Sequence, residues 1–281
     1  MHGISVTVFY SESELYNDMI KKIKRFYFPL KFDTYVIANT YRKEVFIKDG
    51  GMEKLIPVPD LNNEMEFSGY YGGLQTYLKE TLRKNVKNEI SAFFLNDTVF
   101  SHGKFRKIEQ IAFVEWKIKV FFRNIFYSDT NNDAPALLGF QHKPSFLTEL
   151  EGFSEGYINS KFFVMKGIPL QIIDKAFALN EIVVYADVLT SKYSNNVFLN
   201  DSYNNFLANW LHGQEKENSK VWYKSQPLND ENRPYFVSKA KSIIHEHLLS
   251  LRIKNSKSKI YCLARSSFSL KVIAFLTGVK Y

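Results

Sequence analysis

The chain has 281 residues, of which 45% are hydrophobic and 16% aromatic, and its formal net charge is +8. This is enough apolar material for one large core, so we do not expect a disordered chain. The single cysteine, Cys262, excludes an intramolecular disulfide and a cysteine-based zinc site, and it favours a reducing, cytoplasmic location. The positive charge favours an anionic partner: a nucleotide diphosphate, a nucleic acid or an acidic membrane surface.

The sequence shows neither a membrane span nor a secretion signal. No stretch reaches the roughly 18 consecutive apolar residues that cross a bilayer, and the N-terminus lacks the basic and apolar regions of a signal peptide. Basic residues are enriched at the other end, where no Asp or Glu follows Glu246. This asymmetry favours a C-terminal surface that meets phosphate groups.

The first part of the chain predicts strands alternating with helices. Residues 4–10 and 32–39 are strand-like, and a helix start signal at residues 11–14 leads into an amphipathic stretch. Short strand segments follow at 45–47 and 54–58. This order predicts an α/β fold with a mostly parallel, Rossmann-like sheet and right-handed crossovers.

A buried strand followed by polar residues is the most informative segment. Glycines at the start of a helical pattern, residues 69–82, precede an apolar strand at 90–95. That strand ends abruptly in Asn96, Asp97 and Thr98. Polar residues at the carboxyl end of a central strand lie where ligands bind in open α/β sheets.

The second half is predicted to be richer in helices. A long, basic, amphipathic helix is expected at 105–126, strands at 136–140 and 158–165, and a helix at 170–177. Further helices are predicted at 197–211 and 235–251. We therefore expect a catalytic α/β domain over residues 1–213 and a helical C-terminal extension with a basic tail over 214–281. The tail docks on the core or lies in a membrane interface, and we favour core docking.

Three segments, taken together, resemble a known family. Residues 63–74, 94–100 and 156–163 resemble, in this order, bacterial polysaccharide glycosyltransferases of the rhamnan-synthesis type. The resemblance covers roughly residues 4–177 and its motifs are short. It implies a GT-A-like fold and transfer of a sugar from a nucleotide-sugar donor to a saccharide or lipid-linked acceptor, as in capsule or lipopolysaccharide synthesis.

On that resemblance, Asn96, Asp97 and Thr98 occupy the place of the turn that binds the donor diphosphate. The usual turn has two carboxylates around a divalent metal, whereas here only Asp97 has one. The charge on the leaving diphosphate is therefore stabilised either by Mg²⁺ or Mn²⁺ on Asp97 or by basic side chains such as Lys104 and Arg106. The competing interpretation makes Asp97 a turn or helix-cap residue.

Other donor-binding and catalytic candidates come from the flanking segments. Glu66 and Tyr70 are expected to bind hydroxyls of the donor, and Gly69 to admit the donor close to the backbone. The alternative is that Ser68 caps the helix and the glycines serve packing. For the base that takes the acceptor proton we single out Glu155, against the alternative of a solvated loop residue. Secondary candidates for the base are Glu149, Glu151 and Asp201.

Two other classes of function compete with the transferase. A nucleic-acid-binding module would use the basic helix and aromatic side chains, although no recognised motif supports it. A non-catalytic peripheral membrane protein would use the basic tail, and contact with the inner face of the cytoplasmic membrane is also compatible with the transferase. A homodimer would be unsurprising. The signatures of P-loop, dinucleotide-binding, zincin and serine-hydrolase sites are absent from the sequence.

Overall fold

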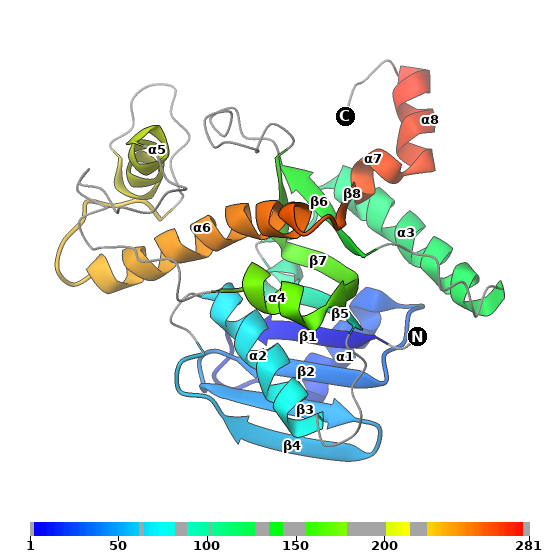
Figure 1. The fold of residues 1–281 in the computed structure, drawn as a ribbon, viewed down its shortest axis with the longest axis horizontal. Helices are drawn as coiled ribbons and strands as arrows, with labels where there is room; N and C mark the ends of the chain where they lie inside the picture. Colours follow the sequence, from blue (N-terminus) through cyan, green and yellow to red (C-terminus); the bar gives the residue numbers. More distant parts are fainter. Residues whose placement is uncertain are drawn as a thin grey trace.

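The computed structural model describes residues 3–61, 65–81, 89–101, 103–126, 135–142, 156–178, 201–213 and 224–277 (Figure 1). One eight-stranded sheet has the strand order β4-β3-β2-β1-β5-β7-β6-β8. Its strands are β1 (Ile4–Phe9), β2 (Thr34–Asn39), β3 (Glu44–Asp49), β4 (Met52–Pro57), β5 (Glu89–Asn96), β6 (Ala136–His142), β7 (Tyr157–Pro169) and β8 (Lys259–Cys262).

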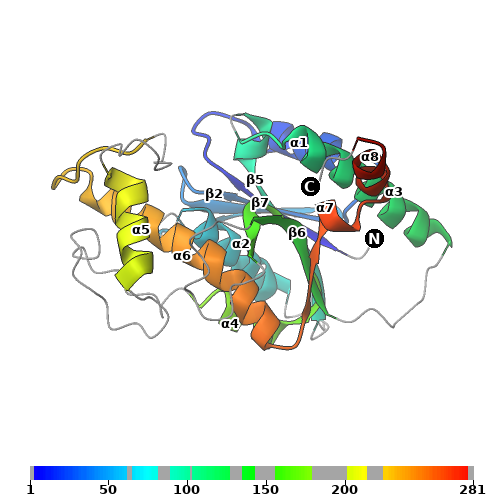
Figure 2. The ribbon, with the colours of Figure 1, turned by 90° about the horizontal axis from the view of Figure 1, so that it is seen from above.

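Helices cover both faces of this sheet (Figure 2). They are α1 (Tyr16–Tyr27), α2 (Glu66–Thr81), the 3-10 helix η2 (Asp97–Phe100), α3 (Lys107–Phe126), α4 (Leu170–Ala176), α5 (Asp201–His212), α6 (Arg233–Asn255), α7 (Leu263–Ser266) and α8 (Phe268–Thr277). The protein is therefore α/β with a Rossmann-like arrangement, as the sequence predicts. Among the described residues, no helix has the length and apolar character needed to cross a bilayer.

The expectation of a mostly parallel sheet is wrong, because the sheet is mixed. β1 is parallel to β2 and to β5, and β6 is parallel to β8, whereas the pairs β2–β3, β3–β4, β5–β7 and β6–β7 are antiparallel. The reason lies in the connections. Parallel neighbours need a crossover of a dozen or more residues. Only Gly50 and Gly51 join β3 to β4, and Gly50 has the positive φ of 58° that a tight hairpin turn requires.

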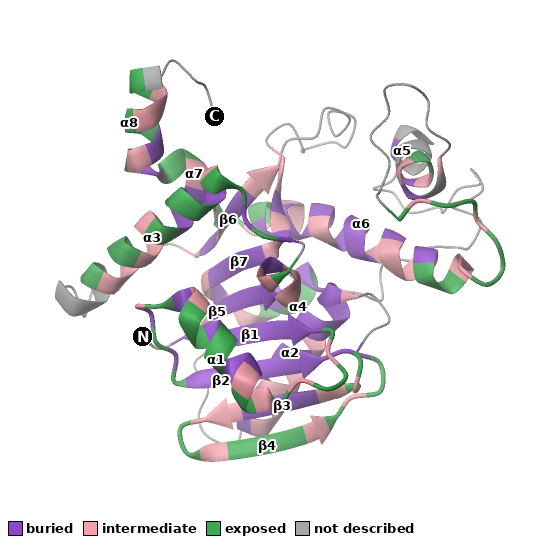
Figure 3. Ribbon diagram, turned by 180° about the vertical axis from the view of Figure 1, so that it is seen from behind, coloured by how far each residue is buried: buried purple, intermediate pink, exposed green. Residues whose placement is uncertain are grey.

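Two hydrophobic cores lie on the two faces of the sheet. On one face α2, α4 and the second half of α6 pack against the central strands. On the other face α1, α3, α7 and α8 pack against the same strands, with many aromatic rings between them. A smaller cluster joins α5 to the first half of α6. The central strands are buried, and exposed residues appear on β4 at the edge (Figure 3).

The C-terminal segment takes part in the sheet. β8 pairs with β6, and Leu263 and Leu270 behind it are buried, in agreement with core docking of the tail. The strand β8 itself was not expected from the sequence. The expected domain boundary at residue 214 lies outside the described residues.

Helix α2 packs closely on β1 and β2 through two of its glycines. A Cβ atom at Gly69 would lie 2.7 Å from Val8 Cγ2 and 3.3 Å from Thr40 Cγ2. A Cβ atom at Gly73 would approach no atom closer than 3.4 Å, which is an ordinary contact distance. Gly69 therefore serves the packing of α2 on the sheet.

We predict that Gly69→Ala lowers the free energy of unfolding by about 1–3 kcal/mol, because the new methyl group overpacks against Val8. Gly73→Ala is the matched control on the same helix. It should change stability by less than about 1 kcal/mol, since alanine is the better helix former and meets no close atom. Urea denaturation of both variants measures the difference, and equal losses would contradict this packing.

Candidate functional site

The order in which strands are added to the sheet reverses between β1 and β5, which are parallel neighbours. From β1 the chain passes through α1 to β2 on one side, while β5 lies on the other side of β1. Such a point is the topological switch of an open α/β sheet, and ligands bind outside the carboxyl ends of the strands that flank it. In the register of the two strands Val8 pairs with Asn96. Tyr10 and Asp97 are the first residues after β1 and β5, so they lie close together at the same edge of the sheet.

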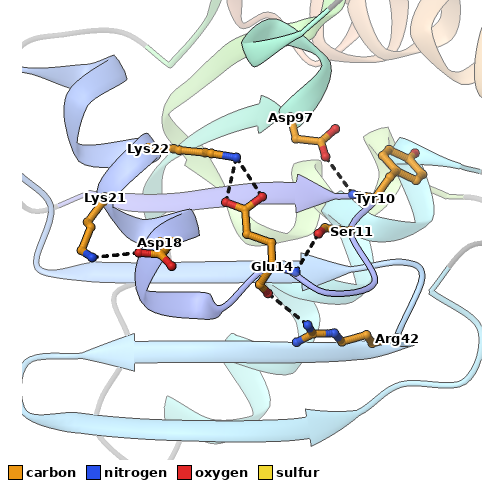
Figure 4. Close-up of polar contacts among 8 residues, drawn as sticks. All are labelled: Tyr10, Ser11, Glu14, Asp18, Lys21, Lys22, Arg42 and Asp97. Atoms are coloured by element: carbon orange, nitrogen blue, oxygen red, sulfur yellow. Dashed lines mark hydrogen bonds and ion pairs between the residues drawn. The ribbon is translucent and has the colours of Figure 1, made fainter.

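Asp97 bridges the ends of these two strands. Its Oδ2 accepts a hydrogen bond of 2.9 Å from the backbone N–H of Tyr10 (Figure 4). The side chain of Asn96, by contrast, accepts the N–H of Thr98 at 3.0 Å and caps η2. Asn96 is therefore the N-cap of η2, and Asp97 lies half-buried in the first turn of η2, at the switch point.

The loop between β1 and α1 is fixed by side chains from the neighbouring strand end. Asn39 Nδ2 donates to the carbonyl of Ser11 at 2.8 Å. Arg42 donates through Nε to the carbonyl of Glu12 at 2.7 Å. It also donates through Nη2 to the carbonyl of Glu14 at 3.0 Å (Figure 4). The loop is therefore preorganised beside Asp97.

The start of α2 contributes a buried carboxylate. Glu66 is 8% exposed, and its Oε1 accepts a hydrogen bond of 3.1 Å from the hydroxyl of Ser160. Tyr70, one turn further on, is fully buried and donates its hydroxyl to the carbonyl of Ser160 at 2.7 Å. Ser68 is no N-cap, because the helix begins at Glu66, and its hydroxyl donates to the carbonyls of Leu61 and Met65.

Ser160 lies in a bulge of β7. Between the pairs Gly139–Phe163 and Gln141–Ile158, β6 advances by two residues while β7 advances by five. Bulges of this kind redirect the strand and are common beside active sites. This one turns the N–H, the hydroxyl and the carbonyl of Ser160 toward side chains of α2 and α6.

Glu246 of α6 is a second carboxylate at this bulge, and the sequence did not reveal it. Its Oε1 accepts the N–H of Ser160 at 2.6 Å. Burial raises the pKa of Glu246, and the charge of Glu66 raises it further, while the Ser160 N–H and Lys239 act in the opposite direction. The two carboxylates share Ser160 as donor, and the nearby negative charge of Glu66 disfavours the ionised form of Glu246.

The hydroxyl of Tyr10 lies within electrostatic reach of the same groups. Its pKa is raised well above the usual value, first by burial and then by the charges of Glu66 and Asp97 and by Tyr235 of α6. Yet 39% of Tyr10 is exposed. Tyr10 is thus a partly exposed residue whose hydroxyl senses the charges of Glu66 and Asp97.

Few basic groups compensate these carboxylates among the described residues. Arg106 is bound to Glu109, with guanidinium distances of 3.0 and 2.8 Å, and Lys104 is exposed just before α3. Within the described ranges no group of three His, Cys, Asp or Glu side chains is arranged to hold a metal ion. His245 stacks on Phe67 and His247 bonds to Tyr203, so the two histidines have different surroundings.

The structure therefore places Glu66, Asn96 and Asp97 near the ends of β1, β5 and β7, and it adds Tyr10, Ser160 and Glu246. The expected donor contacts of Gly69 and Tyr70 are corrected, because Gly69 packs against Val8 and the fully buried Tyr70 donates its hydroxyl to Ser160. Glu155, the predicted base, lies outside the described residues, as do Glu149 and Glu151. Tyr10 follows β1 as Asp97 follows β5, so the rule that predicts Asp97 also applies to Tyr10. For Glu246 the signal is weaker: a lone carboxylate inside the buried face of a long helix.

The fold and this site define an α/β protein with a polar, carboxylate-rich cluster at the switch point of a mixed sheet. Comparison with known proteins adds no identification: no family model, curated protein or solved structure matches the chain.

We predict that Glu246→Gln stabilises the protein at pH 8, by about 1 kcal/mol, because the amide keeps an acceptor for Ser160 and removes a buried charge beside Glu66. A pKa that is raised in the folded state contributes stability that is present below the unfolded pKa and is lost as the pH rises. The advantage of the variant should therefore grow from pH 4 to pH 8. Urea denaturation at both pH values measures it, and a variant that is less stable at pH 8 would contradict the carboxylate pair.

Proposed function

We propose that this protein is a glycosyltransferase that transfers a sugar from a nucleotide-sugar donor to a saccharide or lipid-linked acceptor of a cell-surface polysaccharide. The observation that carries the proposal is the position of Asp97, bonded to Tyr10 at the switch point between β1 and β5. The three sequence segments that resemble polysaccharide glycosyltransferases contain Glu66, Asp97 and Ser160, and these residues border one site.

In such a transfer the acceptor hydroxyl attacks the anomeric carbon of the donor sugar. The bond from that carbon to the diphosphate oxygen breaks, and the diphosphate leaves with the bonding electrons. The acceptor proton goes to a carboxylate. The protein must therefore stabilise negative charge at the leaving group and hold a base near the acceptor.

The described carboxylates suit the second task. Glu66 is buried beside Ser160, and the pKa of Glu246 is raised by burial and by the charge of Glu66. A carboxylate with a raised pKa is a better general base near neutral pH. We therefore add Glu66 and Glu246 to Glu155 as candidates for the base.

The first task falls to Asp97 and to basic side chains. Mg²⁺ is usually held by one or two carboxylates together with waters and the phosphates of the substrate, so a single protein carboxylate is compatible with it. Asp97 would hold Mg²⁺ or Mn²⁺, which when bound would neutralise charge on the diphosphate. Lys104, exposed before α3, is the candidate for direct contact with phosphate, because Arg106 is already paired with Glu109.

We predict that Asp97→Asn lowers the rate of sugar transfer by about 100-fold or more, because the charged group at the diphosphate is lost. The amide oxygen can still accept the N–H of Tyr10. The free energy of unfolding should therefore stay within about 0.5 kcal/mol of the parent. Asp97→Ala removes both the charge and the acceptor and should lower activity and stability together.

Asp18→Ala is the matched control, since Asp18 is a surface carboxylate of α1 that pairs with Lys21. It should leave transfer unchanged. The donor is found first by thermal shift with UDP-, GDP-, CMP- and dTDP-sugars, with and without Mn²⁺, because a ligand at 100 times its Kd adds about 2.7 kcal/mol. Transfer by Asp97→Asn within a few fold of the parent would reject the proposed role. Salt-dependent retention on single-stranded DNA without any nucleotide effect would favour the nucleic-acid alternative.

A further inference from the structure

Exposed apolar side chains gather on two adjacent helices, far along the chain from each other. Fifteen large hydrophobic side chains are exposed in the described part of the chain, and eight of them lie on α3 and α8. These eight form what we call the α3–α8 surface: Ile111, Val114, Ile118, Phe122, Phe268, Val272, Phe275 and Leu276. An apolar cluster of this kind on a folded protein marks an interaction site more often than chance.

The spacing of these residues places them on one face of each helix. On α3 they follow each other at intervals of three and four residues, and on α8 at four, three and one. The opposite faces are already used, because Ala112 and Phe113 of α3 and Leu270 of α8 are buried in the core. Both helices are therefore apolar on two sides, and among the described residues one side of each is packed in the core while the other carries the exposed side chains.

A buried carboxylate holds α8 against α3. Glu115 accepts hydrogen bonds from the hydroxyl of Ser267 at 2.6 Å and from the N–H groups of Phe268 and Ser269 at 2.8 and 3.0 Å. Burial alone would raise its pKa, but these bonds and the contact with Lys119 lower it. A negative charge at the first turn of a helix stabilises that helix end. Helices α3 and α8 lie together at one end of the molecule (Figures 1 and 2).

In the described parts of α3, α7 and α8, the exposed charged side chains are basic. Lys107, Arg265 and Lys271 are exposed on α3, α7 and α8. The acidic residues of α3 that the structure describes, Glu109 and Glu115, are both largely buried and bound to Arg106 and Lys119. Arg265 also lines an open hollow of about 280 Å³ together with residues of β6, β8 and α7: Gln141, Ile260, Tyr261, Cys262 and Ser266.

We propose that the α3–α8 surface binds the surface of an anionic phospholipid bilayer, with its apolar side chains among the acyl chain ends and its basic side chains at the lipid phosphates. Apolar burial together with attraction to anionic lipid is what holds amphipathic helices in a membrane interface. A second copy of the chain fits the surface less well, because two such surfaces facing each other would both carry exposed basic side chains, whereas an anionic bilayer supplies the opposite charge. The proposal uses no residue of the switch-point site and is independent of the transferase proposal.

Co-sedimentation of the full chain with vesicles tests this. The protein should sediment with vesicles of phosphatidylcholine that contain about 30% phosphatidylglycerol, and far less with phosphatidylcholine alone, at about 0.1 M salt. Phe268→Ser/Phe275→Ser should weaken vesicle binding at least about tenfold, because two exposed aromatic groups are lost from the interface. Arg265→Glu/Lys271→Glu should weaken it by a similar factor, and this effect should shrink as salt is raised.

Matched controls carry the same changes elsewhere on the surface. Phe28→Ser/Leu55→Ser replaces equally exposed apolar residues, and Lys31→Glu/Lys175→Glu replaces exposed lysines. Both should bind vesicles as the parent does, and circular dichroism melting checks that every variant is folded. The proposal is overturned if the parent protein does not sediment with anionic vesicles, or if the surface variants and the control variants bind vesicles equally well. It is also overturned if vesicle binding is absent and sedimentation velocity shows a dimer that Phe268→Ser/Phe275→Ser disperses.

Discussion

The geometry of the site depends on Ser160, because all of its polar groups bind side chains from the helices that cover the sheet. Its N–H donates to Glu246 of α6, its hydroxyl donates to Glu66 of α2, and its carbonyl accepts the hydroxyl of Tyr70. A buried polar network in which every group has a partner is rigid and specifies one arrangement. The bulge in β7 thereby fixes two helices relative to the strand ends that carry Asp97 and Tyr10.

This network places two carboxylates close together at a cost in stability. The charge of Glu66 and burial both raise the pKa of Glu246, so the ionised pair is disfavoured in the folded protein. Natural sites retain such unfavourable arrangements when the groups have a task in binding or catalysis. A surface role for Glu246 would not require that cost, and this contrast is the physical basis for treating the pair as functional.

Much of the fold could be predicted from the sequence because its signals are local. The apolar run of β5, followed by polar residues, predicts that Asp97 lies at the end of a strand. The run of β1 before Tyr10 has the same pattern. The antiparallel hairpin of β3 and β4 does not follow from the order of strands and helices, because its signal is the two-residue Gly50–Gly51 turn, which is too short for a parallel crossover. Glu246 could not be found in this way, since its partner Ser160 is 86 residues away in the chain.

Strand β8 adds a requirement on the order of assembly. It supplies the neighbour of β6 at one edge of the sheet, although residue 259 is synthesised long after residue 136, its partner in the register. During synthesis the backbone groups on that side of β6 therefore cannot pair with β8 until residues 259–262 are made. Contacts of such long sequence separation form slowly. A nascent or truncated chain that lacks residues 259–262 would offer β6 as an open template for pairing with other chains, which makes this short strand a safeguard against aggregation.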